Sequence, residues 1–239
     1  MMQETRVEET PKRVLVVTPH PDDAEISCGG TVAKWVKAGA EAYYVLCTDG
    51  GKGSEDPKMT HKRLAKIRLK EQMDAAAVLG VKDVVPLGHP DGELEETREF
   101  RGQIVLAIRR FKPDVVICPD PYRRTFYFHR DHRITGIVTQ DAVFPYARDR
   151  LHYAEHEKEG LEPHKTPTIL FWGAEECDTY IDITDTLELK VEALKKHDSQ
   201  VGGLSSDDTE KWLRDWAKDM GKKAGYEYAE AYRKVSFRF

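Results

Sequence analysis

Two short stretches of the sequence concentrate side chains that bind metal ions and transfer protons. The first, His20–Asp23, directly follows the apolar and mainly β-branched run Val14–Val17. The second, His129–His132, carries two histidines three residues apart, a spacing that puts both on one face of a helix. An imidazole and a carboxylate from the first stretch, joined by an imidazole from the second, form the ligand set of a catalytic zinc site.

These ligand types predict a metal site held by His20, Asp23 and His132. Three protein ligands leave an open position, where zinc lowers the pKa of a bound water to about 7. Zinc is the expected ion, and other divalent metals also suit these ligands. The alternative interpretation is that both stretches are polar surface loops. Two complementary ligand sets, each behind a predicted strand, favour the metal.

Asp22 has two interpretations, and the sequence leaves both open. If the backbone is extended there, Asp22 points away from Asp23, so that Asp23 can bind the metal while Asp22 accepts a proton from water. Aspartate is also a favoured N-cap residue, and a predicted helix begins just behind it.

Buried strands and amphipathic helices alternate through the first half of the chain. Apolar runs of strand length precede segments whose apolar residues recur at helical spacing. This order predicts an α/β fold: a Rossmann-like, doubly wound and mainly parallel sheet with helices on both faces. The predicted strands are Val14–Val17, Ala42–Cys47, Asp83–Leu87 and Asp114–Cys118, and the predicted helices are Ile26–Ala38, His61–Leu79 and Thr97–Phe111.

The fold class indicates where the chemistry should lie. In a doubly wound sheet, ligands bind outside the carboxyl ends of the strands, at the point where the strand order reverses. The first and fourth strands commonly flank that point. The loops behind them are therefore expected to bring His20 and Asp23 close to His132.

The second half of the chain has a looser pattern, and residues 120–167 are expected to form a loop-rich pocket region. Within it, His152–Thr166 is a charged loop that could serve as a lid. No repeat or clear linker interrupts the chain, so residues 1–239 are predicted to form a single domain. The further predicted elements are helices at Ile134–Phe144, Thr184–His197 and Asp207–Ala231, strands at Thr168–Gly173 and Tyr180–Ile183, and a closing edge strand at Val235–Phe239.

The composition is that of an ordinary soluble protein rather than a nucleic-acid-binding or membrane protein. With 239 residues, 40% hydrophobic and 33% charged, and a net charge of −5, the chain lacks the basic field that nucleic acid requires. Its four cysteines are scattered, which favours buried reduced thiols over disulfides or a cysteine zinc site. Without a signal-peptide core or a membrane-length apolar run, a cytoplasmic location is expected.

The first stretch also resembles a known signature. Pro19-His20-Pro21-Asp22-Asp23-Ala24-Glu25, followed by Gly29-Gly30-Thr31, closely resembles that of the LmbE/PIG-L family of zinc-dependent N-deacetylases. His129-Arg130-Asp131-His132 resembles the family's second motif, usually His-Pro-Asp-His, and Arg130 departs from it without loss of a ligand. Similarity over Arg68–Gly80, Pro90–Gly92 and His197–Gln200 extends the resemblance over most of the chain.

The resemblance implies a role for each of these residues. It gives one zinc ion on His20, Asp23 and His132, with Asp22 as the general base. His129 matches the histidine that stabilises the oxyanion or protonates the leaving amine, and Asp131 matches the carboxylate that orients it.

Three more positions carry roles implied by the resemblance alone. Tyr127 falls where some members place a tyrosine that contacts the tetrahedral intermediate. Arg68 matches a substrate-contacting arginine, and Asp91 a residue that lines the sugar pocket.

The implied activity is removal of the N-acetyl group from a 2-acetamido sugar or N-acetylglucosaminyl conjugate, giving acetate and a free amine. The implied partner is a small N-acetylated sugar, with homo-oligomers up to hexamers in some relatives. A phosphoester hydrolase is one alternative, but it would favour two metals and more carboxylates. A sugar-binding protein with a vestigial zinc site is another, although it would need neither Asp22 nor His129.

Overall fold

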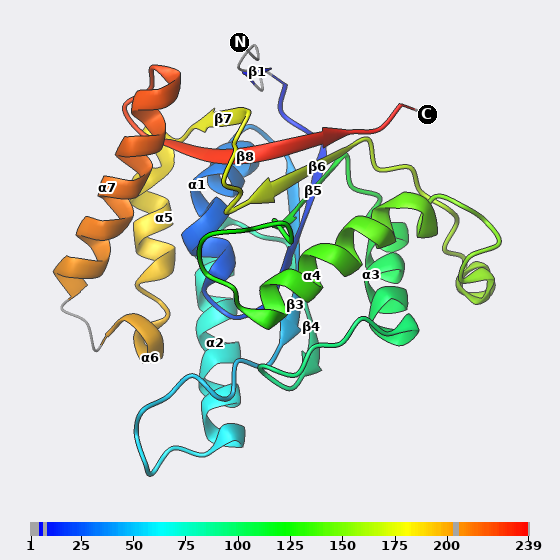
Figure 1. Ribbon diagram of the computed structural model, residues 1–239, viewed down its shortest axis with the longest axis horizontal. Helices are drawn as coiled ribbons and strands as arrows, with labels where there is room; N and C mark the ends of the chain where they lie inside the picture. The colour runs from blue at the N-terminus through cyan, green and yellow to red at the C-terminus, as the bar shows by residue number, and fades with distance from the viewer. Residues whose placement is uncertain (1–4, 7–8, 203–205, 239) are drawn as a thin grey trace.

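A sheet of eight strands organises the described part of the chain, residues 5–6, 9–202 and 206–238 of the computed structural model (Figure 1). The strand order is β1-β7-β8-β6-β5-β2-β3-β4, and only β8 runs antiparallel, between β6 and β7. The prediction of a doubly wound, mainly parallel sheet is confirmed. The strands are β1 (Thr5–Arg6), β2 (Arg13–Thr18), β3 (Glu41–Thr48), β4 (Asp83–His89), β5 (Val115–Pro119), β6 (Thr168–Trp172), β7 (Thr179–Asp182) and β8 (Ala229–Ser236).

Helices cover both faces of this sheet, because residues along each central strand alternate between two cores. Along β2, Leu15 and Val17 join the core beneath α3 and α4, whereas Val14 and Val16 join the core beneath α1 and α2. The helices are α1 (Asp23–Lys37), α2 (His61–Leu79), α3 (Arg98–Phe111), α4 (Arg130–Asp141), α5 (Leu187–Leu194), α6 (Asp198–Val201) and α7 (Ser206–Ala224), with short turns η1 (Ala142–Tyr146), η2 (Ala154–Glu159) and η3 (Thr184–Thr186). None of the helices in the described residues is long and apolar enough to cross a membrane.

The central strand β2 decides where the site can form. It pairs with β3 on one side and with β5 on the other, so the chain order reverses at β2. The loops that leave β2 and β5 therefore open at the same edge of the sheet, as the sequence predicted.

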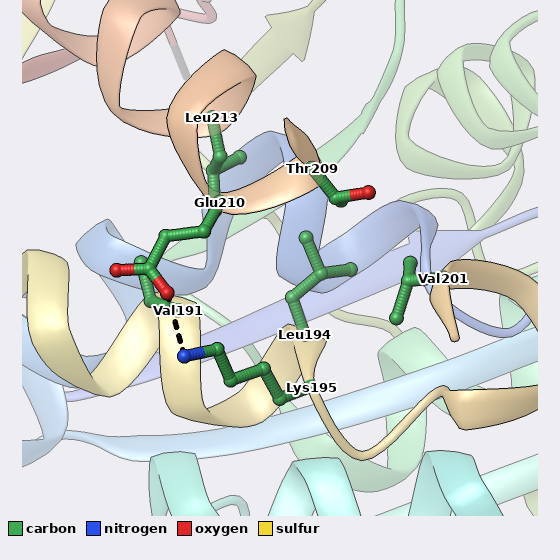
Figure 2. A pocket seen from close by; sticks show the side chains of 7 residues that line it. All are labelled: Val191, Leu194, Lys195, Val201, Thr209, Glu210 and Leu213. Atoms are coloured by element: carbon green, nitrogen blue, oxygen red, sulfur yellow. Dashed lines mark ion pairs between the residues drawn. The ribbon is translucent and has the colours of Figure 1, made fainter. Parts of the chain in front are cut away.

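Helices α5 and α7 pack together through Leu187, Val191 and Leu213, and α5 also packs against α1. Figure 2 shows a small pocket between these helices, closed on one side by the ion pair of Lys195 and Glu210. Its lining contains none of the residues that the sequence assigns to the site.

The end of the chain differs from the sequence prediction. The helix expected over Asp207–Ala231 ends at Ala224, because the chain turns at Gly225 with a φ of 76°. Strand β8 then starts at Ala229, earlier than predicted, and lies inside the sheet rather than at its edge. Phe239, the last residue of the predicted strand, lies outside the described residues.

Residues His152–Thr166, the segment expected to form a flexible lid, are held in place at their N-terminal end. Arg109 of α3 is fully buried, and its guanidinium donates to the carbonyl oxygens of Tyr146, Ala147, Asp149, His152 and Tyr153. Residues Ala154–Glu159 then form η2, and His156 is buried against the Tyr153 ring. Helix α3 therefore packs against the core with its apolar face and also holds this segment through Arg109.

Candidate metal centre and active site

The loops behind β2 and β5 bring the two predicted ligand stretches together. Pro19–Asp22 connects β2 to α1, and the loop after β5 ends at His129, where α4 begins. The ring centroid of His20 lies 4.6 Å from that of His129 and 5.3 Å from that of His132. Residues separated by more than a hundred positions thus meet because β2 and β5 are neighbours.

The three predicted metal ligands converge on one carboxylate oxygen. Asp23 Oδ2 lies 3.1 Å from His20 Nδ1 and 3.2 Å from His132 Nε2. All three side chains are buried, with exposed fractions of 7% for His20, 8% for Asp23 and 2% for His132. The nitrogens offered by His20, His129 and His132 also lie within 4.8 Å of one another.

The state of His132 supports a metal at this point. Both of its ring nitrogens are buried and make no hydrogen bond, although Nε2 is only 3.2 Å from Asp23 Oδ2. A buried nitrogen without a hydrogen bond costs free energy. His132 Nε2 and Asp23 Oδ2 lie close together but are not aligned for a hydrogen bond, which is expected of two ligands that face one cation. The donor set therefore fits a divalent metal.

The opposite nitrogen of His20 faces two further carboxylates. Nε2 lies 3.0 Å from Asp131 Oδ2 and 3.2 Å from Asp91 Oδ1. Asp131 is itself held by the backbone N–H groups of Gly92 (2.7 Å) and Leu94 (3.2 Å). Metal-binding histidines commonly donate their second N–H to a carboxylate, which fixes the orientation of the ring.

Asp131 was expected to orient His129, and the structure corrects this. Its carboxylate accepts from His20, Gly92 and Leu94, and its backbone N–H, not its carboxylate, contacts His129. The reason is the start of α4, which turns the Asp131 side chain toward β2 while its N–H points back at the N-cap residue, His129.

The charges around His20 show that the centre attracts cations. Burial disfavours its imidazolium, but hydrogen bonds to Asp131, Asp23 and Asp91 outweigh this and raise the pKa of His20 to about 12. Burial likewise disfavours the ionised form of Asp23, yet His132 and His20 hold the pKa of that carboxyl well below its usual range. Such an excess of carboxylates is suited to a divalent cation.

Asp22 adopts a strained backbone conformation beside this centre. Its φ is 97° and its ψ −31°, so the extended backbone assumed from the sequence is wrong. Left-handed conformations of this kind cost non-glycine residues about 1–3 kcal/mol and persist only where the surroundings enforce them. Asp22 occupies the N-cap position of α1, but its side chain makes no capping hydrogen bond. The capping interpretation therefore fails as well.

The Asp22 carboxylate is placed to act as a base. It is 16% exposed, and its Oδ2 accepts from Arg68 Nη2 at 3.1 Å. Burial, followed by repulsion from Asp23, raises the pKa of Asp22 to about 7. A carboxylate with such a pKa accepts protons far more readily than an ordinary aspartate.

Arg68 is buried and hydrogen-bonded to other residues of the chain, whereas an arginine that contacts substrate is expected to be exposed. It is 4% exposed, and its guanidinium donates to the carbonyl oxygens of Gly50 (2.9 Å) and Pro21 (2.6 Å) as well as to Asp22. A Cβ at Gly50 would lie 2.8 Å from Arg68 Nη1, and φ there is +62°. The glycine-rich loop after β3 therefore makes room for the arginine that holds Asp22.

His129 is arranged as a hydrogen-bond donor. Its Nδ1 accepts the backbone N–H of Asp131 at 3.2 Å, so the neutral ring carries its proton on Nε2. Burial, together with the charges of His20 and His132, lowers the pKa of His129 and favours this neutral form.

Tyr127 lies at the mouth of the site. It is 58% exposed, and its ring centroid is 5.0 Å from that of His132 and 6.2 Å from that of His129. Phe126 and Phe128 on either side are also exposed. Aromatic faces of this kind suit the apolar faces of a sugar ring.

Some residues around the centre were assigned no role from the sequence. Trp172, the last residue of β6, packs edge-on against His132, with ring centroids 5.2 Å apart. Its position at a strand end next to β5 is the one clue. Gln72, Glu25 and His197 form a buried chain of hydrogen bonds that begins at Asp22. All three lie in stretches that carry the family resemblance, but it gave them no role; they come from three separate helical segments, and no local pattern links them.

Comparisons with known proteins agree with this arrangement. Residues 15–143 match the family described as PIG-L: GlcNAc-PI de-N-acetylase. The chain is similar to diacetylchitobiose deacetylase of Thermococcus kodakarensis, with 36% identity over 224 residues, covering 94% of this chain and 83% of that protein. It is 29% identical over 201 residues to the probable N-acetyl-alpha-D-glucosaminyl L-malate deacetylase 2 of Bacillus anthracis, covering 79% and 81% of the two chains.

A solved structure of a similar protein has the same fold. The N,N'-diacetylchitobiose deacetylase from Pyrococcus horikoshii aligns with a TM-score of 0.89 and 35% identity, over 95% of this chain and 84% of that chain. The chain belongs to the PIG-L (LmbE-like) family of N-deacetylases.

Proposed function

We propose that this protein hydrolyses the N-acetyl group of a 2-acetamido sugar, using zinc held by His20, Asp23 and His132. The observation that carries the proposal is the buried His132 Nε2, which lies beside Asp23 without a hydrogen bond. Asp22, whose raised pKa suits a proton acceptor, directly precedes Asp23 in the chain. A binding protein would need the ligands but not the base. The family relationship adds the reaction type, amide hydrolysis.

Bound zinc would supply Lewis acidity toward the amide carbonyl and a lowered pKa for a water molecule. His20 would present Nδ1 to the metal, since Nε2 faces Asp131 and Asp91. Asp131 and Asp91 would then hold the ring and stabilise its N–H.

The residues of the chain carry the remaining steps. Asp22 accepts a proton from the attacking water as its oxygen forms a bond to the amide carbon. His129 donates its Nε2–H to the carbonyl oxygen as negative charge builds there, and one such donor is typically worth about 3–4 kcal/mol. When the C–N bond breaks, the proton held by Asp22 passes to the departing nitrogen, leaving acetate and a free amine.

The test is acetate release from a panel of N-acetylated glycosides. With zinc-loaded protein we expect acetate and free amine in equal amounts from N-acetylglucosaminides, since the similar proteins are named for such substrates. Chelation should abolish release, and added zinc should restore it. Release of phosphate from phosphoesters, or tight sugar binding without turnover, would contradict the proposal.

Asp131→Asn tests the proposed support of His20. Asparagine keeps the size but removes the charge and places an N–H₂ group among the N–H groups of His20, Gly92 and Leu94. We expect zinc affinity to fall about 10- to 100-fold, measured by competition with a chromogenic chelator. Asp120→Asn is the matched control, because this buried aspartate at the end of β5 instead pairs with Arg233. Equal zinc affinities in both variants would rule out this role for Asp131.

Tyr127→Phe tests the hydroxyl at the mouth of the site. If the hydroxyl donates to the developing oxyanion, its loss lowers kcat about tenfold with little change in KM. If the ring only packs against the sugar, kcat stays unchanged. Tyr122→Phe is the control, because that hydroxyl in the same loop bonds to Gln140 instead. Steady-state kinetics with one N-acetylglucosaminide decide between the two outcomes.

We also propose a cytoplasmic setting and a single domain over residues 1–239. All four cysteines are free, and Cys28, Cys47 and Cys118 are buried, as expected of a protein kept reduced.

A further inference from the structure

A chain of buried hydrogen bonds runs from Asp22 into the interior between α1, α2 and α6. The backbone N–H of Asp22 donates to Gln72 Oε1 (3.3 Å), and Gln72 Nε2 donates to Glu25 Oε1 (2.9 Å). The second oxygen of Glu25 accepts from His197 Nε2 at 3.1 Å. Gln72, Glu25 and His197 have no exposed surface, so solvent cannot replace any of these partners.

The direction of each hydrogen bond in this chain is fixed. A carboxylate paired with the His197 imidazole accepts at both of its oxygens, so Gln72 must turn its N–H₂ group toward Glu25. The carbonyl end of the Gln72 amide is thereby directed at the Asp22 N–H. The pair of His197 and Glu25 thus determines which end of Gln72 meets Asp22.

The residue at the end of this chain needs such support. Asp22 has a φ of 97°, which an aspartate leaves readily unless its peptide groups are held on both sides. Arg68 holds the preceding side through the Pro21 carbonyl, and Gln72 holds the N–H of Asp22 itself. Both residues lie on α2, one turn apart.

We infer that Gln72, oriented by Glu25 and His197, is a positioning residue that keeps Asp22 in the conformation needed to accept the proton. This inference rests on the proposed function, because Asp22 matters here as the base. Gln72 lies away from the reacting atoms and acts only through the backbone of Asp22. A displacement of a reacting group by about 1 Å can cost about 10²-fold in rate, so such support should be visible in kcat.

The single variants remove the match of donors to acceptors. In Gln72→Glu, a carboxylate faces the Glu25 carboxylate. In Glu25→Gln, an amide at 25 that still accepts from His197 can donate to residue 72 only if Gln72 flips and presents its N–H₂ to the Asp22 N–H. We expect either change to lower kcat about 10- to 100-fold while KM stays within about twofold. Zinc content should remain that of the wild type.

The exchange of both residues restores the match. In the double variant Gln72→Glu/Glu25→Gln, the carboxylate at 72 accepts from both the Asp22 N–H and the amide at 25, whose oxygen still accepts from His197. We expect kcat to recover to within about threefold of the wild type, a recovery that mere loss of stability would not produce. Recovery by exchange is therefore the deciding measurement.

Glu230→Gln is the matched control. Glu230 is a buried carboxylate against the same helix α1, where it accepts from the N–H groups of Gly30 and Thr31 and pairs with Lys190. This variant should lower the melting temperature but leave kcat unchanged. It separates the effect of a disturbed buried carboxylate from the effect on Asp22.

Each result supports or overturns the inference. Single variants with wild-type kcat overturn it, and so does a double variant that folds and binds zinc but turns over no faster than the singles. If the singles cannot be purified, the double variant alone decides, and its failure to fold overturns the inference as well. A wild-type protein without deacetylase activity would instead overturn the proposed function, so the two failures are distinguishable.

Discussion

Replacing Asp22 with asparagine is expected to lower kcat by about 10²- to 10⁴-fold while leaving zinc bound. The amide keeps the shape of the side chain and an oxygen that accepts from Arg68, so the strained loop stays intact. It cannot accept the proton of the attacking water. The measurements are kcat on an N-acetylglucosaminide, the metal content and the melting temperature of the same preparation.

Two outcomes would contradict this assignment. A variant with near wild-type turnover would remove Asp22 from the reaction, and loss of zinc together with turnover would make it a ligand. Asp114→Asn is a suitable control, because Asp114 lies just before β5, away from the strand ends that carry the site, and accepts from the backbone N–H of Arg13. That variant should keep most of the activity.

The wild-type enzyme should also lose turnover as the pH falls through the pKa of Asp22. The base works only when ionised, and burial together with Asp23 raises its pKa to about 7. A bound cation favours the ionised form of Asp22, so the fall of kcat on the acidic side of the pH profile should lie at or below that pH. The residual activity of Asp22→Asn should not show this fall at low pH.

His20→Ala and His132→Ala are each expected to abolish metal binding and turnover. The wild type should carry about one divalent metal per chain, held by three ligands. Changes in residues that merely orient ligands cost about 10- to 100-fold in affinity, and removal of a ligand should cost more. Metal analysis after dialysis, together with acetate release, provides the measurement.

His164→Ala is the matched control for these variants. His164 is also partly buried, but its Nε2 contacts the carbonyl oxygen of Pro113, outside the centre. It should retain the metal and the activity. Full metal occupancy in His20→Ala or His132→Ala would mean that the ion binds elsewhere.

Much of the fold, and the meeting of His20, Asp23 and His132, could be predicted from the sequence, because both depend on local patterns. A β-branched run followed by a helical pattern forms a strand and helix in almost any α/β context, as β2 and α1 do. Parallel strands then place their loops at one edge, so the sequence alone predicts that His20, Asp23 and His132 meet. The end of the last helix was predicted too late, because Gly225 stops a helix whose charged pattern continues in the sequence.

Only the tertiary structure decided how those residues are held. Whether Asp22 is extended depends on Arg68 and Gln72, which reach it from another helix, and no local rule predicts a φ of 97° for an aspartate. Which ring Asp131 supports depends on how α4 packs against β2, and the structure gives it His20 rather than His129. A motif fixes the types of side chain that can do the chemistry, whereas buried hydrogen bonds between distant segments fix their directions, and those bonds form only when the sheet brings the segments together.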